Sequence, residues 1–323
     1  MSGSGLPYRL RPNKFVDREL FAELISLLAA ERDSNAYAYI SMGGNHLSDH
    51  LAVYRRAGLR KLYAFDNDDQ VVDRQKFNAP FDGLICETHR SSELPTRIDS
   101  IIQSLDVDNV IIWLDFTEAK HLEQLGEIQA LCRSLRSGDV LRVTMNIDFR
   151  TLHKRESQLS AIENKLPVDE KRAALMKRAL GAYMPRKIKK VRGGEDAATV
   201  AESIARACEL GIEEGSITLV PCPILITEYQ DSSKMVSVTL ILADEDHPEP
   251  VPAGWNFKPS NWSDVERIVA PDLSPREKFA LEKEMHMDPD MVSSKLGFKL
   301  DADAIKAYAR FHRFYPSFQM VAD

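Results

Sequence analysis

Two long apolar runs, SITLVPCPILITEY (216–229) and MVSVTLILA (235–243), are separated only by QDSSK (230–234). Each run has the continuous apolar character of a buried strand, and the link between them is rich in turn-forming residues. A parallel crossover connection needs a dozen residues or more, so a link this short favours an antiparallel hairpin. The sequence therefore predicts two adjacent antiparallel strands late in the chain.

Upstream of this hairpin, strand-like and helix-like segments alternate. The strand-like segments are 36–42, 61–66, 83–88, 109–116 and 139–148, and the helix-like segments are 17–33, 47–58, 68–78, 93–105 and 117–136. The run NVIIWLDF (109–116) is the clearest strand among them. Five strand–helix alternations with short connections are typical of a doubly wound parallel sheet.

The pattern of predicted helices and strands divides the chain into five parts. These are a helical start (1–35), a Rossmann-like half (36–149), a basic helical insertion (150–195), a last helix with the hairpin (196–244), and a Pro-rich linker with a helical tail (245–323). Helices are predicted over 197–212, 273–285 and 301–315, and the sequence contains no internal repeat.

Composition limits the class of protein. The chain has 323 residues, 44% of them hydrophobic and 28% charged, which suits a soluble globular protein with a large core. No window approaches the roughly 20 apolar residues of a membrane span, and the N-terminus has no apolar secretory core. The four cysteines are far apart and form no CxxC pair. We therefore expect free thiols, a cytoplasmic protein and no membrane partner.

Charge is distributed unevenly along the chain. The net charge is −7, yet residues 150–192 contain thirteen Lys and Arg against four Asp and Glu, a local balance of +9, so the remainder carries about −16. Two solvated helices with ordinary basic faces would explain this segment. The alternative is a docking surface for a nucleic acid or an acidic protein, whose phosphate contacts would weaken with salt.

The order of these elements resembles the class I S-adenosylmethionine-dependent methyltransferases, in which a seventh strand inserts antiparallel into a parallel sheet. The resemblance covers about residues 36–244. It implies an α/β fold with a doubly wound seven-stranded sheet closed by an antiparallel hairpin, with a helical insertion and a helical C-terminal tail in addition. It also implies S-adenosylmethionine as the cofactor.

Ligands of open parallel sheets bind outside the carboxyl ends of the strands, which makes the residues there the candidate site. The resemblance implies that the loop after the first strand approaches the cofactor, that an acid after the second accepts the ribose hydroxyls, that the third strand end faces adenine, and that the fourth faces the methionine end and the acceptor. The corresponding cofactor-binding residues are Gly43, Gly44, Asn45, Asp66, Asn67, Glu87, Thr88 and Asp115. Asp66 and Asp115 could instead be helix caps.

An oxygen acceptor must lose a proton, so a base is expected near the methyl group. The candidate catalytic residues are Asp115, His46 and Asn146, with His89 a weaker alternative base. Asn146 and Asp148 end the fifth strand.

The stretch SMGGNHLSDH (41–50) also invites a metal interpretation through His46, Asp49 and His50. It partly resembles the His-x-His-x-Asp-His motif of metallo-β-lactamase-like hydrolases. Asn45 and Leu47 occupy the places of the first two histidines, so half of the ligand set is absent. We therefore predict no metal site and interpret these side chains as exposed or capping residues at a helix start.

A nicotinamide dehydrogenase is a further alternative, because a strand, a glycine loop, a helix and a strand ending in an acid would also bind NAD(P). Asp66 lies 22 residues beyond Gly44, which suits either cofactor. The chain has no G-x-G-x-x-G in this loop, and the closing antiparallel hairpin favours the methyltransferase. An NAD(P)-dependent oxidoreductase is therefore the lesser alternative.

Two further stretches bear on the reaction. LDFTEA (114–119) lacks the Asn/Asp-Pro-Pro-Tyr/Phe of methyltransferases that act on base amino groups, and the tail 297–316 is similar to poorly characterised bacterial O-methyltransferases. The sequence therefore predicts a methyltransferase directed at oxygen, with an unknown methyl acceptor. Because the loop 41–50 lacks the family's acid and spaced glycines, a catalytically degraded subunit that binds a partner through its basic insertion is the main alternative.

Overall fold

A computed structural model describes residues 11–31, 34–148, 159–216, 218–246, 251–284, 291–292 and 298–315. Its centre is an eight-stranded sheet in the order β3-β2-β1-β4-β5-β7-β6-β8. The strands are β1 (Tyr37–Ser41), β2 (Leu62–Asp66), β3 (Ile85–Thr88), β4 (Asn109–Asp115), β5 (Val140–Asn146), β6 (Leu219–Gln230), β7 (Lys234–Asp244) and β8 (Glu266–Arg267).

The pairing of the strands confirms the predicted fold class. Strands β1 to β5 pair in parallel, whereas β7 runs antiparallel to both β5 and β6. The predicted hairpin therefore closes the sheet. The prediction of seven strands was wrong by one, because two residues of the segment predicted as a linker, Glu266 and Arg267, add a short strand parallel to β6.

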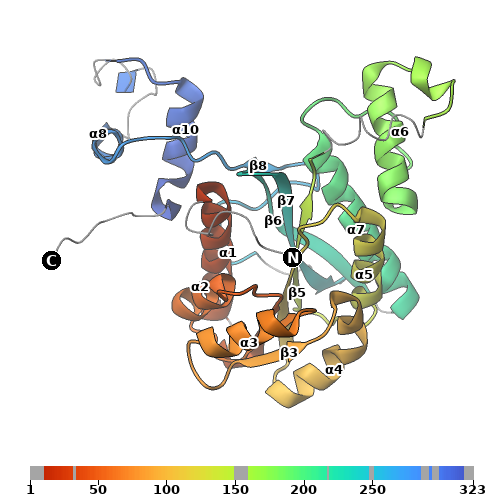
Figure 1. Ribbon diagram of the computed structural model, residues 1–323, viewed down its shortest axis with the longest axis vertical. Helices are drawn as coiled ribbons and strands as arrows, with labels where there is room; N and C mark the ends of the chain where they lie inside the picture. The colour runs from red at the N-terminus through yellow and green to blue at the C-terminus, as the bar shows by residue number, and fades with distance from the viewer. Residues whose placement is uncertain are drawn as a thin grey trace.

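Helices cover both faces of the sheet (Figure 1). The helices α1 (Pro12–Glu31), α2 (Ser48–Ala57) and α3 (Asp69–Asn78) lie on one side, and α4 (Leu94–Leu105), α5 (His121–Cys132) and α7 (Asp196–Gly215) on the other. The helix α6 (Val168–Leu180) packs against α5, whereas the tail helices α8 (Pro275–Glu284) and α10 (Ala302–Phe311) lie on the opposite side of the molecule in Figure 1. Each face buries its own apolar cluster.

Local sequence signals explain several helix ends. Gly58 follows α2 with φ 70°, the left-handed conformation that glycine adopts without steric cost. Asp68 caps α3, because its side chain accepts a hydrogen bond from the backbone N–H of Gln70. The predicted helix 117–136 is shorter than expected and spans only His121–Cys132.

The first helix is bound to the sheet by a buried polar network. Asp17 of α1 forms an ion pair with Arg142 of β5 at 2.6 Å, and both side chains are fully buried. The other oxygen of the carboxylate accepts a hydrogen bond from Thr227 Oγ1 at 2.5 Å. The guanidinium also lies over the rings of Phe21 and Trp113. This network fixes α1 against β4, β5, β6 and β7.

Within the described residues, no helix is long and apolar enough to cross a membrane. Residues 150–158 of the basic insertion, which the sequence predicts to be helical, lie outside the described part of the chain.

Candidate functional site

The sequence-predicted residues lie along one edge of the sheet, where the parallel strands end. Strand register places Ser41 of β1 beside Trp113 of β4, Asp66 of β2 beside Thr88 of β3, and Asp115 of β4 beside Thr144 of β5. The loop after β1 and the acids that end β2 and β4 therefore meet at the carboxyl edge of the sheet, where ligands of this architecture bind.

The loop after β1 turns on two glycines with positive φ. Gly43 has φ 66° and Gly44 has φ 54°, and Leu47 before α2 has φ 48°. A Cβ on Gly43 would lie 3.0 Å from His50 Cε1, whereas a Cβ on Gly44 would meet no atom of the described residues within 4 Å. The backbone at Gly44 is therefore open to a ligand, while Gly43 is needed for packing.

Helix α3 holds this loop in place through its carbonyl groups. Gln75 Nε2 donates to the carbonyl oxygens of Met42 at 2.8 Å and Gly44 at 3.3 Å. Asn78 Nδ2 donates to the carbonyl of Asn45 at 2.7 Å. These bonds use the carbonyl groups of the loop, so Gln75 and Asn78 hold the loop against α3. Sequence reasoning did not single out either side chain.

Beneath the loop, Asp49 and His50 form a buried network. The Asp49 carboxylate accepts hydrogen bonds from Tyr39 Oη at 2.7 Å and Ser41 Oγ at 2.5 Å, and His50 Nδ1 lies 3.4 Å from its other oxygen. His50 Nε2 lies 3.0 Å from the carbonyl oxygen of Tyr63. Predicting Asp49 and His50 as exposed or capping residues was wrong, because the sequence pattern could not show that this helix turn packs under the loop.

His46, by contrast, is exposed. The three side chains of the metal hypothesis therefore do not converge, and within the described ranges no group of three or more His, Cys, Asp or Glu side chains could hold a metal ion.

The Asp49 carboxylate should make the stability of the protein depend on pH in the acid range. Burial alone would raise the pKa of Asp49, but the charge of His50 and the hydrogen bonds from His50, Ser41 and Tyr39 outweigh burial and lower it. A carboxylate whose pKa is lowered on folding stabilises the protein at pH values above its unfolded pKa of about 4. This stabilisation is lost as the pH falls below that value. We expect the difference in unfolding free energy between wild type and Asp49→Asn to shrink by about 1 kcal/mol from pH 6 to pH 3.

Denaturant titrations at several pH values measure this difference. The matched control is Asp73→Asn on the exposed face of α3, for which we expect no such shrinkage. If the difference in unfolding free energy between wild type and Asp49→Asn does not change with pH, the pKa of the Asp49 carboxylate is not lowered in the folded protein.

Asp66, at the end of β2, is half-buried. Burial raises its pKa, against the lowering effect of hydrogen bonds from the backbone of Asp68 and Asn67. Its Oδ1 accepts from the N–H of Asp68 at 3.1 Å, and since Asp68 is the cap of α3, the alternative role of Asp66 as that helix cap was wrong. The side chain of Asn67 is exposed at the same edge.

The end of β3 carries a second polar cluster. Tyr63 Oη donates to Glu87 Oε2 at 2.9 Å, and Arg97 lies 3.7 Å from the same oxygen. Thr88 is exposed. His89 is buried, stacks on Phe65 with ring centroids 4.4 Å apart, and has both ring nitrogens in hydrogen bonds.

His89 therefore has a structural role, which does not suit the catalytic base that the sequence offered as a weaker alternative. Its Nε2 lies 3.0 Å from Tyr63 Oη and its Nδ1 lies 3.0 Å from the carbonyl oxygen of Arg90. Glu87, although exposed, is held by Tyr63, so a ligand there would meet an oriented carboxylate.

At the end of β4, Asp115 pairs with a residue of α1. Lys14 Nζ donates to Asp115 Oδ2 at 2.7 Å, and the side chains of Lys14 and Asp115 are only 6% and 17% exposed. Among the described residues, neither the buried Oδ1 of Asp115 nor the buried hydroxyl of Tyr229 on β6 has a hydrogen-bond partner. Burial raises the pKa of Tyr229, which keeps it a neutral hydroxyl donor. Asp115 does not cap a helix, because α5 begins only at His121.

The last predicted site residue, Asn146, ends β5. Its side-chain oxygen accepts from the N–H of Asp148 at 2.8 Å, and its carbonyl oxygen lies 2.6 Å from His121 Nε2 at the start of α5. Asn146 therefore fixes the turn after β5, and the structure brings it to the same edge as Asp115 on the neighbouring strand.

Lys14 and Tyr229 were missed by sequence reasoning. Lys14 lies 101 residues from Asp115 in the chain, and it follows an ordinary helix start with no motif around it. Tyr229 is one apolar residue in a predicted strand. Only the packing of α1 across β4 and β6 brings the two side chains to the site, so no local pattern could have found them.

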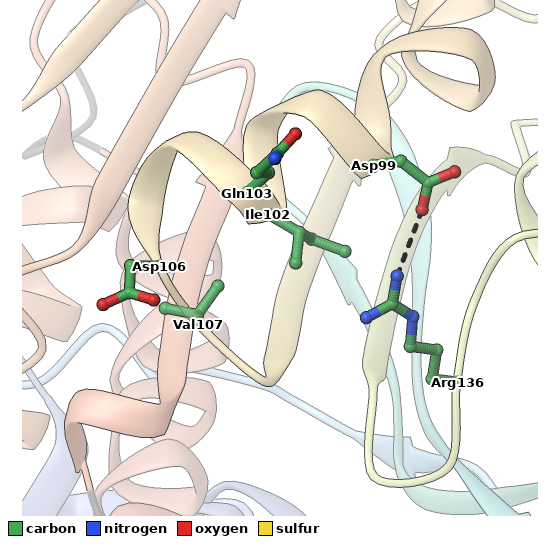
Figure 2. Close-up of a pocket in the computed structure, with 6 residues that line it drawn as sticks. All are labelled: Asp99, Ile102, Gln103, Asp106, Val107 and Arg136. Carbon is green, nitrogen blue, oxygen red and sulfur yellow. Dashed lines mark hydrogen bonds and ion pairs between the residues drawn. The ribbon is translucent and has the colours of Figure 1, made fainter.

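A pocket of about 480 Å³ lies at the opposite edge of the sheet. In Figure 2 its lining comes from the end of α4, from Asp106 and Val107 before β4, and from Arg136 before β5, which pairs with Asp99 at 3.3 Å. Because these residues precede the strands, the pocket is separate from the candidate site.

Several solved structures are similar to part of this chain at low sequence identity. Trm1 from Pyrococcus horikoshii, in complex with S-adenosyl-L-methionine, is 12% identical with a TM-score of 0.47 over 71% of this chain, and the match spans only 56% of that protein's chain. A methyltransferase structure from Thermobifida fusca is 13% identical with a TM-score of 0.37, covering 71% of this chain and 82% of the other.

The N-methyltransferase NodS from Bradyrhizobium japonicum is 8% identical with a TM-score of 0.37, covering 71% of this chain and 97% of the other. No curated protein sequence matches the chain. The family described as "Putative O-methyltransferase" matches residues 6–323, almost the whole sequence. The chain belongs to this methyltransferase family.

Proposed function

We propose that this protein transfers a methyl group from S-adenosylmethionine to an oxygen atom of its acceptor. The observation that carries the proposal is the ion pair at the end of β4, where Asp115 keeps one buried oxygen that has no hydrogen-bond partner among the described residues. The family's description supports oxygen as the acceptor atom.

The residues at the strand ends fit the cofactor. The open space beside Gly44 admits a ligand against the backbone of residues 43–45, and the half-buried Asp66 offers a carboxylate oxygen to ribose hydroxyls. Asn67 lies exposed next to it, and Glu87 and Thr88 stand at the neighbouring strand end, on the adenine side. When bound, S-adenosylmethionine supplies an electrophilic methyl group on a sulfonium.

The chain's own residues would orient the acceptor and remove its proton. Positioning the acceptor oxygen in line with the methyl group supplies much of the acceleration. Asp115 and His46 are the two titratable side chains of the candidate set that could accept the hydroxyl proton. Asn146 ends the strand next to that of Asp115 and would line the acceptor side.

Two measurements test this function. Calorimetry with S-adenosylmethionine and S-adenosylhomocysteine should give binding, and an absence of heat at millimolar ligand would exclude the methyltransferase. Transfer of a labelled methyl group should then be assayed with catechol, benzoate and phenethylamine as probes. We expect label on the hydroxyl or carboxylate probe, and label on the amine alone would refute oxygen as the acceptor atom.

A second candidate function rests on the basic surface of Arg186, Lys189 and Arg192. We propose that this surface binds RNA or DNA. The three side chains are exposed and form no ion pair within the described residues, whereas neighbouring Lys187 pairs with Glu202 and Lys190 with Glu170. The ion pairs leave three of these five cations for phosphates.

Charge reversal of Arg186, Lys189 and Arg192 to glutamate should abolish retention on RNA or DNA columns that wild type shows at low salt. Lys306→Glu on the exposed face of α10 is the matched control and should leave retention unchanged. Wild-type retention on an acidic protein matrix but not on nucleic acid would favour an acidic protein as the partner.

We also propose a cytoplasmic location. The four cysteines, at 86, 132, 208 and 222, carry free thiols, as suits a reducing compartment. Fractionation of cells that express the tagged chain tests this location.

A further inference from the structure

A series of hydrogen bonds runs beneath the glycine loop, the segment 42–47 between β1 and α2. The N–H of Gly43 donates to Ser41 Oγ at 3.4 Å, and Ser41 Oγ donates to Asp49 Oδ2 at 2.5 Å. The other carboxylate oxygen, Asp49 Oδ1, lies 3.4 Å from His50 Nδ1. His50 Nε2 completes the series, 3.0 Å from the carbonyl oxygen of Tyr63. The backbone of the loop is therefore linked to β2 through Asp49 and His50.

The acceptors in this series decide where its protons lie. The carbonyl oxygen of Tyr63 can only accept, so Nε2 of His50 carries a proton. Burial raises the pKa of Asp49, but the charge of His50 and three side-chain hydrogen bonds lower it more strongly. The carboxylate is therefore ionised at neutral pH and can also only accept. Nδ1 of His50 thus carries the second proton, and the ring is an imidazolium.

The imidazolium ring lies directly against the loop. His50 is fully buried, and a Cβ built on Gly43 would lie 3.0 Å from its Cε1 and 3.2 Å from its Nδ1. The ring also packs edge-on against Tyr39, with ring centroids 4.9 Å apart. A ring packed this closely cannot change its orientation without displacing Gly43. The bonds that hold the ring therefore also hold the backbone proposed to contact the cofactor.

Loss of the Nδ1 proton would break the series at its centre. The nitrogen lone pair would then face Asp49 Oδ1 with no hydrogen between them. Two buried acceptors would lie in contact, and both would lack a donor, which is costly inside a protein. A turn of the ring or a shift of the first turn of α2 would relieve this contact, and either movement displaces Gly43.

We propose that His50 is the positioning residue of the glycine loop, an inference that rests on the proposed function. Its protonated ring holds Gly43, and with it the loop, in the shape that binds the cofactor, and the neutral ring does not. Cofactor affinity is therefore linked to the proton on Nδ1. The affinity is full at low pH, where the ring is charged, and falls as the pH rises and the proton leaves.

The ionisable groups around the ring leave this proton as the one that titrates beneath the loop. Among the described residues, the ring contacts Asp49 of its own helix and Tyr39 of β1, while β2 presents a backbone carbonyl. Burial and the charge of Asp49 raise the pKa of Tyr39, against the effect of Arg142 on β5, so the hydroxyl stays protonated. His46, the exposed histidine of the loop, is the group that needs a control.

Calorimetry of the full chain with S-adenosylhomocysteine measures this link. We expect the wild-type affinity to fall about 5- to 10-fold between about pH 5.5 and about pH 8. Binding should also take up protons from the buffer, which titrations in buffers of different ionisation enthalpy detect. His46→Gln is the matched control. Whatever it does to the affinity itself, it should keep the wild-type dependence on pH, because His46 is not part of the hydrogen-bond series.

Asp49→Asn tests the role of the proton directly. In place of Oδ1, the new amide nitrogen donates to the Nδ1 lone pair of a neutral ring, and in place of Oδ2 the amide oxygen still accepts from Tyr39 and Ser41. The neutral ring is then held as the imidazolium was. The affinity should therefore stay within about 2-fold of the low-pH wild-type value at every pH. A merely structural role of Asp49 would lower the affinity equally at all pH values.

Three results would overturn the positioning role while the proposed function stands, since the ligand still binds in each. They are a wild-type affinity that does not change with pH, a pH dependence that disappears in His46→Gln, and a pH dependence that persists in Asp49→Asn. If Asp49→Asn does not fold, the wild type and His46→Gln still decide. If the wild type binds no ligand at any pH, the proposed function itself fails, and the positioning role fails with it.

Discussion

Arg142→Met should lower the free energy of unfolding by about 3–5 kcal/mol, because it leaves the fully buried carboxylate of Asp17 without its cation. The same change removes the guanidinium from between Phe21 and Trp113 and its 2.6 Å hydrogen bond to Thr239. Methionine keeps much of the volume, so the loss reports the charge and its bonds. Urea titration followed by far-UV circular dichroism gives the value.

The matched control is Arg133→Met, on the exposed ion pair with Glu214. Exposed pairs contribute about 0–1 kcal/mol, so this variant should be close to wild type. Combining Asp17→Leu with Arg142→Met removes both charges and should recover part of the loss, as buried pairs often do when replaced by apolar residues. A loss below 1 kcal/mol for Arg142→Met would mean that the pair is not desolvated.

Gly43→Ala should destabilise the protein by about 2–4 kcal/mol, since two costs add. The new Cβ stands at φ 66°, in the left-handed region that costs a non-glycine residue about 1–2 kcal/mol. It would also lie 2.9 Å from Leu47 Cδ2 and 3.0 Å from His50 Cε1, and His50 is held by Tyr63 and Asp49. Overpacking of this kind costs about 1–3 kcal/mol.

Gly44→Ala separates the cost of the left-handed backbone from the cost of overpacking. Gly44 has a similar φ of 54°, but no atom of the described part of the chain lies within 4 Å of a new Cβ, so the loss of stability should be limited to about 1–2 kcal/mol. For cofactor binding the order of the two variants should be reversed, with the larger loss of affinity in Gly44→Ala, because the open side of Gly44 is the side proposed for the cofactor. Equal destabilisation by the two variants in thermal melts would show that contact with His50 is unimportant.

The fold was predictable because its signals are local or depend on spacing alone. Predicted strands such as 61–66 and 109–116 differ from β2 and β4 by one residue at an end, and Gly58 ends α2 as expected. The antiparallel hairpin followed from a link too short for a crossover. The two-residue strand β8 carries no such signal, since it is too short to show alternation.

The site was predictable only at the level of strand ends. Asp66, Thr88, Asp115 and Asn146 do end their strands, and strand topology brings such residues to one edge. Their partners could not be predicted. The burial of Asp49 and the pairing of Lys14 with Asp115 depend on how helices pack across strands distant in sequence, and the sequence alone does not encode this as a pattern.

The anchoring of α1 has a consequence for the order of folding. Asp17 bonds with Arg142, Thr227 and Ser237, which are 125, 210 and 220 residues away along the chain. During synthesis the first helix therefore leaves the ribosome long before its partners on β5, β6 and β7 exist. Closing such long loops is slow, so Lys14 reaches Asp115 only late in folding, and ligand binding should be among the last native properties to appear during refolding.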